Sequence, residues 1–305
     1  MILTRFVYAM CVGGGVLLTV ACGSHGPPRS VPEPGAAPSD SLEVYIGKVR
    51  RLAAASAPKK AEVATIESRD GELRTALNAL HDGETPARHR RVAAAYRSEG
   101  VLDLAYDHYA AATRLDSRDA AAYDGLARIW RDWGLPHLGL SDARRAVFYA
   151  PSSPTVHNTL GTVLYALDQR PAARTEFERA LALDPQASYA LINLCYERFQ
   201  ASDFATAAGH CHNALRLDPA SAPAHNNLAL VYAATGQTQL AEAEFAAVGD
   251  AASRLFNAGI MYSAGDRYVD AAQAFDAAER LRPGWKLAGD RAEQARRLSQ
   301  SSGPR

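Results

Sequence analysis

The chain has 305 residues and a formal net charge of zero, with 33 Lys and Arg against 33 Asp and Glu. A neutral balance disfavours a general nucleic-acid binder, because such proteins need surplus cations to displace counterions from phosphates. Short alanine clusters recur and alternating β-branched runs are nearly absent, which predicts an all-α protein because alanine favours helix.

The first 22 residues predict an export signal. A single cation, Arg5, precedes an uncharged and largely apolar run over residues 6–21, too short for a secure membrane span but typical of a signal peptide. Leu18 lies four residues before Cys22, and Ala21 directly precedes it. This ending resembles the lipobox of bacterial lipoproteins, which implies that Cys22 is lipidated and begins the mature chain. A plain secretory signal, with Cys22 incidental, is the alternative.

Residues 23–39 are rich in Pro, Gly and Ser and have little apolar surface to bury, which predicts a tether between anchor and folded part. Gly23, and not Asp, follows Cys22. In the lipoproteins that the sequence resembles, this implies sorting to the outer membrane, facing the periplasm.

Residues 40–85 predict helices that precede the main repeat. The stretches 41–56 and 61–81 are amphipathic, and Leu73, Leu77 and Leu80 share one helical face in the second. They are expected to form either a diverged repeat or an N-terminal cap.

A period of 34 residues organises the rest of the chain. Pro151, Pro185 and Pro219 are 34 residues apart, and one unit carries Leu160, Gly161, Ala173, Phe177 and Ala180 at corresponding positions. This pattern resembles the tetratricopeptide repeat (TPR), a helix–turn–helix unit of that length. The resemblance implies a right-handed α-solenoid of six repeats over residues 86–283, a capping helix over 284–299 and a disordered tail over 300–305. The expected repeats start near Pro86, Ala120, Pro154, Ser188, Ala222 and Ala252.

The stretch GHCHNALRLDPA, residues 209–220, places His210 and His212 on either side of Cys211. Adjacent side chains on a helix diverge by about 100°, so the three cannot converge on one metal ion, and no metal site is expected. Cys211 holds the large-residue position of its repeat, and Cys195 holds the small-residue position of the preceding helix. In an oxidising exported compartment the two are candidates for a disulfide, with two buried free cysteines as the alternative.

The TPR resemblance also implies that the first helix of each repeat lines a concave groove. The first two repeats place charged residues there, namely Arg90, Arg97, Asp124, Arg128, Arg131 and Asp132. Repeats four to six place aromatic, aliphatic and amide residues there, namely Tyr189, Ile192, Asn193, Tyr196, Phe199, Asn227, Leu230, Phe256, Asn257 and Ile260. We expect this second set to bind a partner, with the recurring Asn pairing with a peptide backbone. The alternatives are that the capping helix or a second copy covers the face, and that the Asn serve local backbone.

Catalysis finds little support. No glycine-rich phosphate loop and no G-x-S-x-G motif occurs in the sequence, and neither an enzyme nor a cofactor is expected. A metallohydrolase using His210, His212 or His225 is the least favoured class. The architecture resembles the pilotin lipoproteins of type IV pili, which implies an adaptor for a protein or extended peptide in envelope assembly. A docking platform for cell-wall enzymes or proteases, or a structural homodimer, are the alternatives.

Overall fold

The computed structural model describes residues 60–301. The expected signal segment, tether, Cys22, the helix over 41–56 and residues 302–305 lie outside this range. Within it the chain forms fifteen helices and no strand, which confirms the all-α prediction. None of the helices described is both long and apolar enough to cross a membrane.

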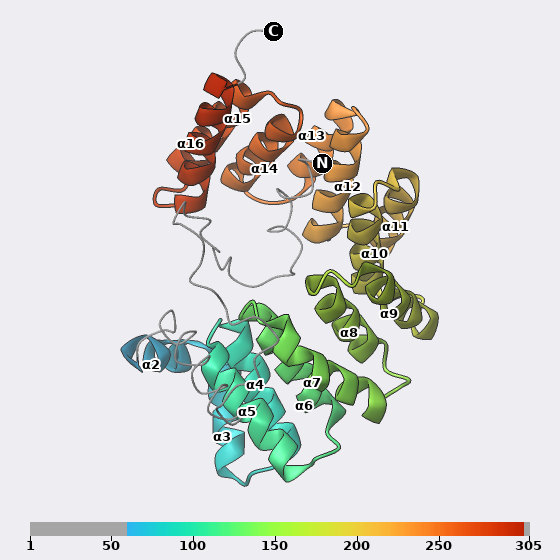
Figure 1. Cartoon of the computed structure of the whole chain (residues 1–305). Coiled ribbons are helices and arrows are strands. Elements are labelled where there is room, and N and C mark those ends of the chain that lie inside the picture. Colours follow the sequence, from blue (N-terminus) through green and yellow to red (C-terminus); the bar gives the residue numbers. More distant parts are fainter. Residues whose placement is uncertain (1–59, 302–305) are drawn as a thin grey trace, which may run out of the picture. The chain divides into compact units, whose positions relative to one another are not determined.

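The helices follow one another through short turns (Figure 1). They are α2 (Lys60–Arg69), α3 (Gly71–His81), α4 (Pro86–Ser98), α5 (Leu102–Leu115), α6 (Ala120–Asp132), α7 (Pro136–Tyr149), α8 (Pro154–Ala166), α9 (Arg170–Leu183), α10 (Ser188–Gln200), α11 (Phe204–Leu217), α12 (Ala222–Ala234), α13 (Thr238–Ala247), α14 (Ala251–Ala264), α15 (Tyr268–Leu281) and α16 (Lys286–Ser301).

Each repeat is a pair of helices, α4–α5 through α14–α15, and the sixth begins at Ala251, one residue before the expected Ala252. The turn inside every pair contains one residue with positive φ: Gly100, Gly134, Asp168, Ser202, Gly236 and Asp266. A left-handed residue reverses the chain there, and glycine adopts this conformation without a Cβ penalty. Pro86, Pro136 and Pro154 begin their helices, where a missing N–H costs nothing.

The chain before the repeats differs from the expectation of one long stretch over 61–81. Asp70 interrupts it, because its carboxylate accepts hydrogen bonds from the backbone N–H groups of Glu72 and Leu73 and so caps a new helix, α3. Leu73 is fully buried on α3, and Leu77 and Leu80 pack partly buried against the same core as α4 and α5.

The described residues divide into two compact units, 60–173 and 174–301, with the boundary inside α9. In the first unit the first helices of successive repeats, α4, α6 and α8, lie against one another; in the second, α10, α12 and α14 do so. Each unit has its own core of small and large side chains. An example is Gly259 on α14, where an added Cβ would lie 2.7 Å from the ring of Phe275 on α15. This close approach explains why that helix pair needs a small residue opposite its large one.

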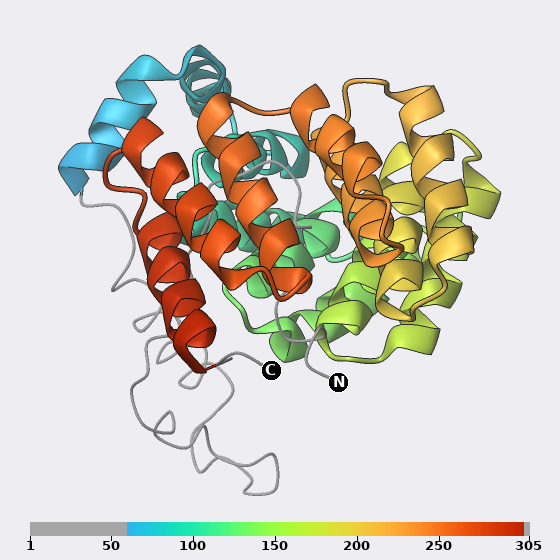
Figure 2. The same ribbon diagram turned by 90° about the horizontal axis from the view of Figure 1, so that it is seen from above.

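The last helix closes the second unit. Ala288, Ala292 and Ala295 of α16 are buried and pack against α15, while the opposite face of α16 is polar. Figure 2 shows α16, in red, running alongside α15. The helix ends at Ser301, two residues beyond the predicted boundary at 299, so Gln300 and Ser301 are helical and do not belong to a tail.

Candidate functional site

The ten residues predicted to bind a partner lie on α10, α12 and α14, all in the second unit. Tyr189, Ile192, Asn193 and Ile260 are partly exposed. The other six are buried, at 8% exposure or less: Tyr196, Phe199, Asn227, Leu230, Phe256 and Asn257. The surface open to a partner is therefore smaller than the sequence predicts.

Neighbouring rings account for much of this burial. Tyr196 stacks on Phe199 with ring centroids 6.3 Å apart, and Phe199 meets Phe204 at 6.0 Å. Phe256 stacks on Trp285 at 4.7 Å, just before α16 begins. The segment leading into the capping helix thus covers Phe256. This agrees with the alternative that the capping helix, and not a partner, covers this face. Sequence periodicity places a residue on a helix face but does not show what lies over that face.

The amides of Asn227 and Asn257 already have partners inside the chain. The Asn227 Nδ2 donates to the carbonyl oxygen of Ile192 at 3.2 Å, which links α12 to α10. The Asn257 Nδ2 donates to the side-chain oxygen of Asn226 at 3.1 Å, which links α14 to α12. These two Asn therefore hold successive first helices together, in line with the local role that the sequence left open.

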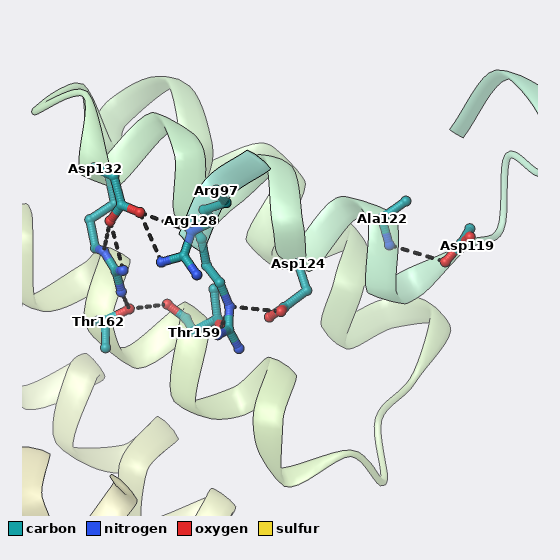
Figure 3. A network of polar contacts seen from close by, with 9 residues as sticks. Arg97, Asp119, Ala122, Asp124, Arg128, Asp132, Thr159 and Thr162 are labelled. Carbon is teal, nitrogen blue, oxygen red and sulfur yellow. Dashed lines mark hydrogen bonds and ion pairs between the residues drawn. The ribbon is translucent and has the colours of Figure 1, made fainter. Parts of the chain in front are cut away.

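The charged residues predicted on the first helices, apart from Arg90, form a connected network in the first unit (Figure 3). Asp132 lies between two arginines: one carboxylate oxygen accepts from Arg97 at 2.8 and 3.0 Å, and the other accepts from Arg131 at 2.8 and 3.2 Å. Arg131 also donates to Thr162 of α8 at 2.9 Å. The network thus joins α4, α6 and α8 through charge-assisted bonds, which are the stronger kind.

A second branch of the network starts at Arg128. Its guanidinium pairs with Asp124 at 2.8 Å, as Figure 3 shows, and donates to the Thr159 hydroxyl at 3.1 Å. Arg90 pairs with Asp119 at 2.6 Å, while Asp119 also caps α6 by accepting from the N–H of Ala122. Side chains of Arg97 and Arg128 keep 28% and 27% of their surface exposed, so this face offers oriented guanidinium groups to a ligand.

The structure contains a disulfide between Cys195 of α10 and Cys211 of α11, and both residues are fully buried. The two histidines beside Cys211 are less buried than the cysteine. His210 is half-buried, and burial followed by the charge of Arg198 lowers its pKa. His212 is exposed, with its Nε2 3.3 Å from the Tyr232 hydroxyl. Among the residues described, no group of three or more His, Cys, Asp or Glu is placed to hold a metal ion.

One contact that recurs in several repeats was not predicted from the sequence. Tyr123, His157 and His225 occupy equivalent positions of their repeats, and each contacts the backbone carbonyl six residues earlier: Ser117 at 3.3 Å, Pro151 at 2.9 Å and Pro219 at 3.0 Å. Glu244 holds the other nitrogen of His225 at 2.6 Å. These side chains therefore brace the loop between repeats. Their spacing of 34 and 68 residues, one and two repeat lengths, could have indicated this contact from the sequence.

No protein-family model and no curated protein sequence matches the chain. Solved structures do. A chain of the APC/C hetero-tetramer Cut9–Hcn1 aligns with a TM-score of 0.64 at 18% identity, over 83% of this chain and 49% of its own length. A tetratricopeptide repeat protein from Parabacteroides merdae aligns with a TM-score of 0.58 at 14% identity, over 83% of this chain and 98% of its own.

PilW, described as a widely conserved type IV pilus biogenesis factor, aligns with a TM-score of 0.58 at 20% identity, over 67% of this chain and 97% of its own. The present chain spans about half the length of the Cut9–Hcn1 chain. At such identities the likeness establishes the fold alone, which is a solenoid of stacked TPR hairpins.

Proposed function

We propose that this protein is a lipid-anchored TPR scaffold of the cell envelope, without catalytic activity, that binds a protein or an extended peptide along its first helices. The observation that carries the proposal is the side-by-side arrangement of α10, α12 and α14, on which Tyr189, Ile192 and Ile260 keep part of their surface accessible. Partly exposed aliphatic and aromatic groups on stacked first helices suit the apolar side chains of a partner.

The location rests on the lipobox-like ending at Cys22 and on the Cys195–Cys211 disulfide. Structural disulfides persist in oxidising compartments such as the periplasm and are rare in the cytosol. We place the protein at the outer membrane, facing the periplasm. Type IV pilus biogenesis, the process named for PilW, is the first envelope assembly to test in this setting.

Photo-crosslinking in the native cell tests the proposal. The probe replaces Ile192, which is partly exposed on α10, and a control probe replaces Arg179, which is exposed on the second helix α9. Tyr196 is a poorer site because only 8% of it is exposed. A discrete adduct with another protein at Ile192 alone supports the scaffold and identifies its partner by mass spectrometry.

Two other outcomes contradict the proposal. An adduct with a second copy of the chain indicates homodimerisation through this face. No adduct above that of the Arg179 control rejects the α10–α14 face and shifts attention to the charged network of α4, α6 and α8. A partner that proves to be a cell-wall enzyme or protease keeps the scaffold but changes the assembly that it serves.

A further inference from the structure

The C-terminal end of α7 presents aromatic and basic side chains to solvent. Phe148 is 77% exposed, the largest fraction among the large apolar residues described as exposed, and Tyr149 is 39% exposed. Their rings meet edge to face with centroids 5.1 Å apart. Arg144 and Arg145, one helical turn earlier, are exposed as well. Leaving a phenylalanine ring in water is unfavourable, and two exposed rings beside exposed arginines suit a surface that another phase or molecule covers.

Tyr123 of α6 joins this end of α7 to the preceding loop. Its ring stacks on Tyr149 at 6.0 Å, and the guanidinium of Arg145 lies 5.4 Å from the same ring centre. Its hydroxyl donates to the carbonyl of Ser117 at 3.3 Å. The loop after α5 therefore meets the same ring. We call the surface formed by Arg144, Arg145, Phe148, Tyr149 and residues 114–118 the basic aromatic edge.

The last residues of α5 and the loop after it continue the character of the edge. Leu115 is 49% exposed and stands 34 residues before Tyr149, at the equivalent position of the previous repeat. Arg114 and Arg118 flank it and are exposed. The exposed acid of this segment, Asp116, accepts a hydrogen bond from the backbone N–H of Arg118 at 2.9 Å. Four arginines stand against Asp116 and the partly buried Asp142, whose carboxyl interacts with Arg145, so the edge is locally cationic in a chain whose net charge is zero.

We propose that the basic aromatic edge docks on the surface of an anionic phospholipid bilayer. Aromatic rings are stable at the level of the headgroups, and arginines extend their guanidinium groups to lipid phosphates. Charge complementarity favours this occupant, since an anionic membrane surface attracts clustered cations that lie close to it. Rings that project from a helix end enter a bilayer without needing the shape complementarity that a protein partner requires. The inference rests on the membrane location proposed above, because an anchored chain keeps the edge near lipid.

The test places a photo-crosslinking phenylalanine analogue at Phe148 of the full chain, and a control probe at Val269, which is 61% exposed on α15. The chain is mixed with vesicles of phosphatidylglycerol and phosphatidylethanolamine, or with neutral phosphatidylcholine vesicles. We expect lipid adducts at Phe148 with the anionic vesicles. Reversing two charges, Arg144→Glu with Arg145→Glu, should reduce the adducts by roughly ten-fold or more. Raised salt should reduce them too.

The same assay in a Cys22→Ser chain separates the edge from the anchor. Lipid adducts that persist without the anchor support the edge even if the proposed lipidation is wrong. An anchored chain that floats with vesicles but gives no more lipid adduct at Phe148 than at Val269 overturns the inference and leaves the anchor standing. Equal labelling with neutral and anionic vesicles, or an adduct only with a protein or a second copy, also overturns it.

Discussion

Cys195 of α10 and Cys211 of α11 are bonded to each other at the two positions that Gly259 and Phe275 occupy in the sixth repeat. In the sixth repeat a ring lies directly on a glycine and fills the space between the helices. In the fourth repeat a covalent bond spans the same space, across a sequence separation of 16 residues. The fourth repeat thus replaces aromatic packing with a cross-link at an equivalent place.

Removing this bond should destabilise the second unit. For Cys195→Ala with Cys211→Ala we expect a loss of about 3 kcal/mol in the free energy of unfolding, because a loop of this length no longer restricts the unfolded chain. Denaturant unfolding followed by circular dichroism measures it. Reductant should weaken the wild type and leave the double variant unchanged. Cys195→Gly with Cys211→Phe should regain part of the loss, and no gain over the alanine pair would contradict the packing equivalence.

The turns inside the hairpins allow a matched test of backbone strain. Gly134 has φ of 74°, and an added Cβ there meets nothing within 4 Å, so Gly134→Ala introduces left-handed strain without a clash. We expect it to cost about 1 kcal/mol. Ser202 holds the same turn position with φ of 61°. Ser202→Gly should raise the melting temperature, by less than the alanine lowers it, because glycine adds freedom to the unfolded chain. A melting temperature lowered by Ser202→Gly would refute this explanation.

Asp132 should stabilise the first unit through its two arginines. In Asp132→Asn, Arg97 and Arg131 lose the negative charge between them, and we expect the free energy of unfolding to fall by about 1–3 kcal/mol. The control is Asp270→Asn, because Asp270 pairs with Arg267 where both side chains are well exposed, and such a pair contributes little. Equal effects of the two substitutions in urea unfolding would show that the network adds nothing to stability.

Asp142 of α7 should lower the stability of the first unit as the pH rises through about 6. Burial raises the pKa of its carboxyl to about 6, against the opposing effects of Arg145 and a hydrogen bond from Trp130. The folded state therefore prefers the protonated acid, and this stabilisation is lost as the pH rises through about 6. Asp142→Asn should raise the free energy of unfolding at pH 7.5 by up to about 3 kcal/mol and have little effect near pH 4. The exposed Asp116→Asn is the control, and a variant no more stable than wild type at pH 7.5 refutes the prediction.

The histidine pair of the first repeat should lower the stability of the fold as the pH falls, which is the opposite pH dependence to that of Asp142. The Nδ1 atoms of His89 and His108 lie 3.0 Å apart, so the N–H of one ring donates a hydrogen bond to the nitrogen of the other. Burial first, and then the charge of His89, lowers the pKa of His108 below its ordinary value of 6.5. The stabilisation is present above pH 6.5 and is lost as the pH falls through the lower folded value. The melting temperature of the wild type should drop more between pH 7 and 5 than that of His108→Gln; parallel curves would contradict this.

Much of the fold was readable because each repeat restates the same local pattern. The prolines 34 residues apart, the turn glycines and the small residues opposite large ones are short-range signals, and five of the six repeats begin at the residue that the period predicts. The helix boundary at Asp70 was not predicted from local pattern. A single capping carboxylate there divides a stretch whose apolar pattern continues through it. A hydrogen bond outweighed periodicity there.

The predicted site was less readable, because exposure depends on residues distant in the chain. Phe256 lies on a first helix as expected, yet Trp285, 29 residues later, lies against its ring. Asn227 and Asn257 recur at one repeat position, yet their amides bond to the preceding first helix. A linear pattern shows which side chains share a face, whereas burial and hydrogen-bond partners depend on what packs on that face.

The sequence by itself determined the helical class, the 34-residue period, the pairing of Cys195 with Cys211 as candidates and the signals that point to export. These follow from residue type and spacing, which act over one or two helical turns or repeat at a fixed interval. Only the tertiary structure decided which groove residues stay accessible, how Asp132 joins Arg97 to Arg131, and that Phe148 remains uncovered. Those outcomes depend on long-range packing, in which a side chain's surroundings come from several helices at once.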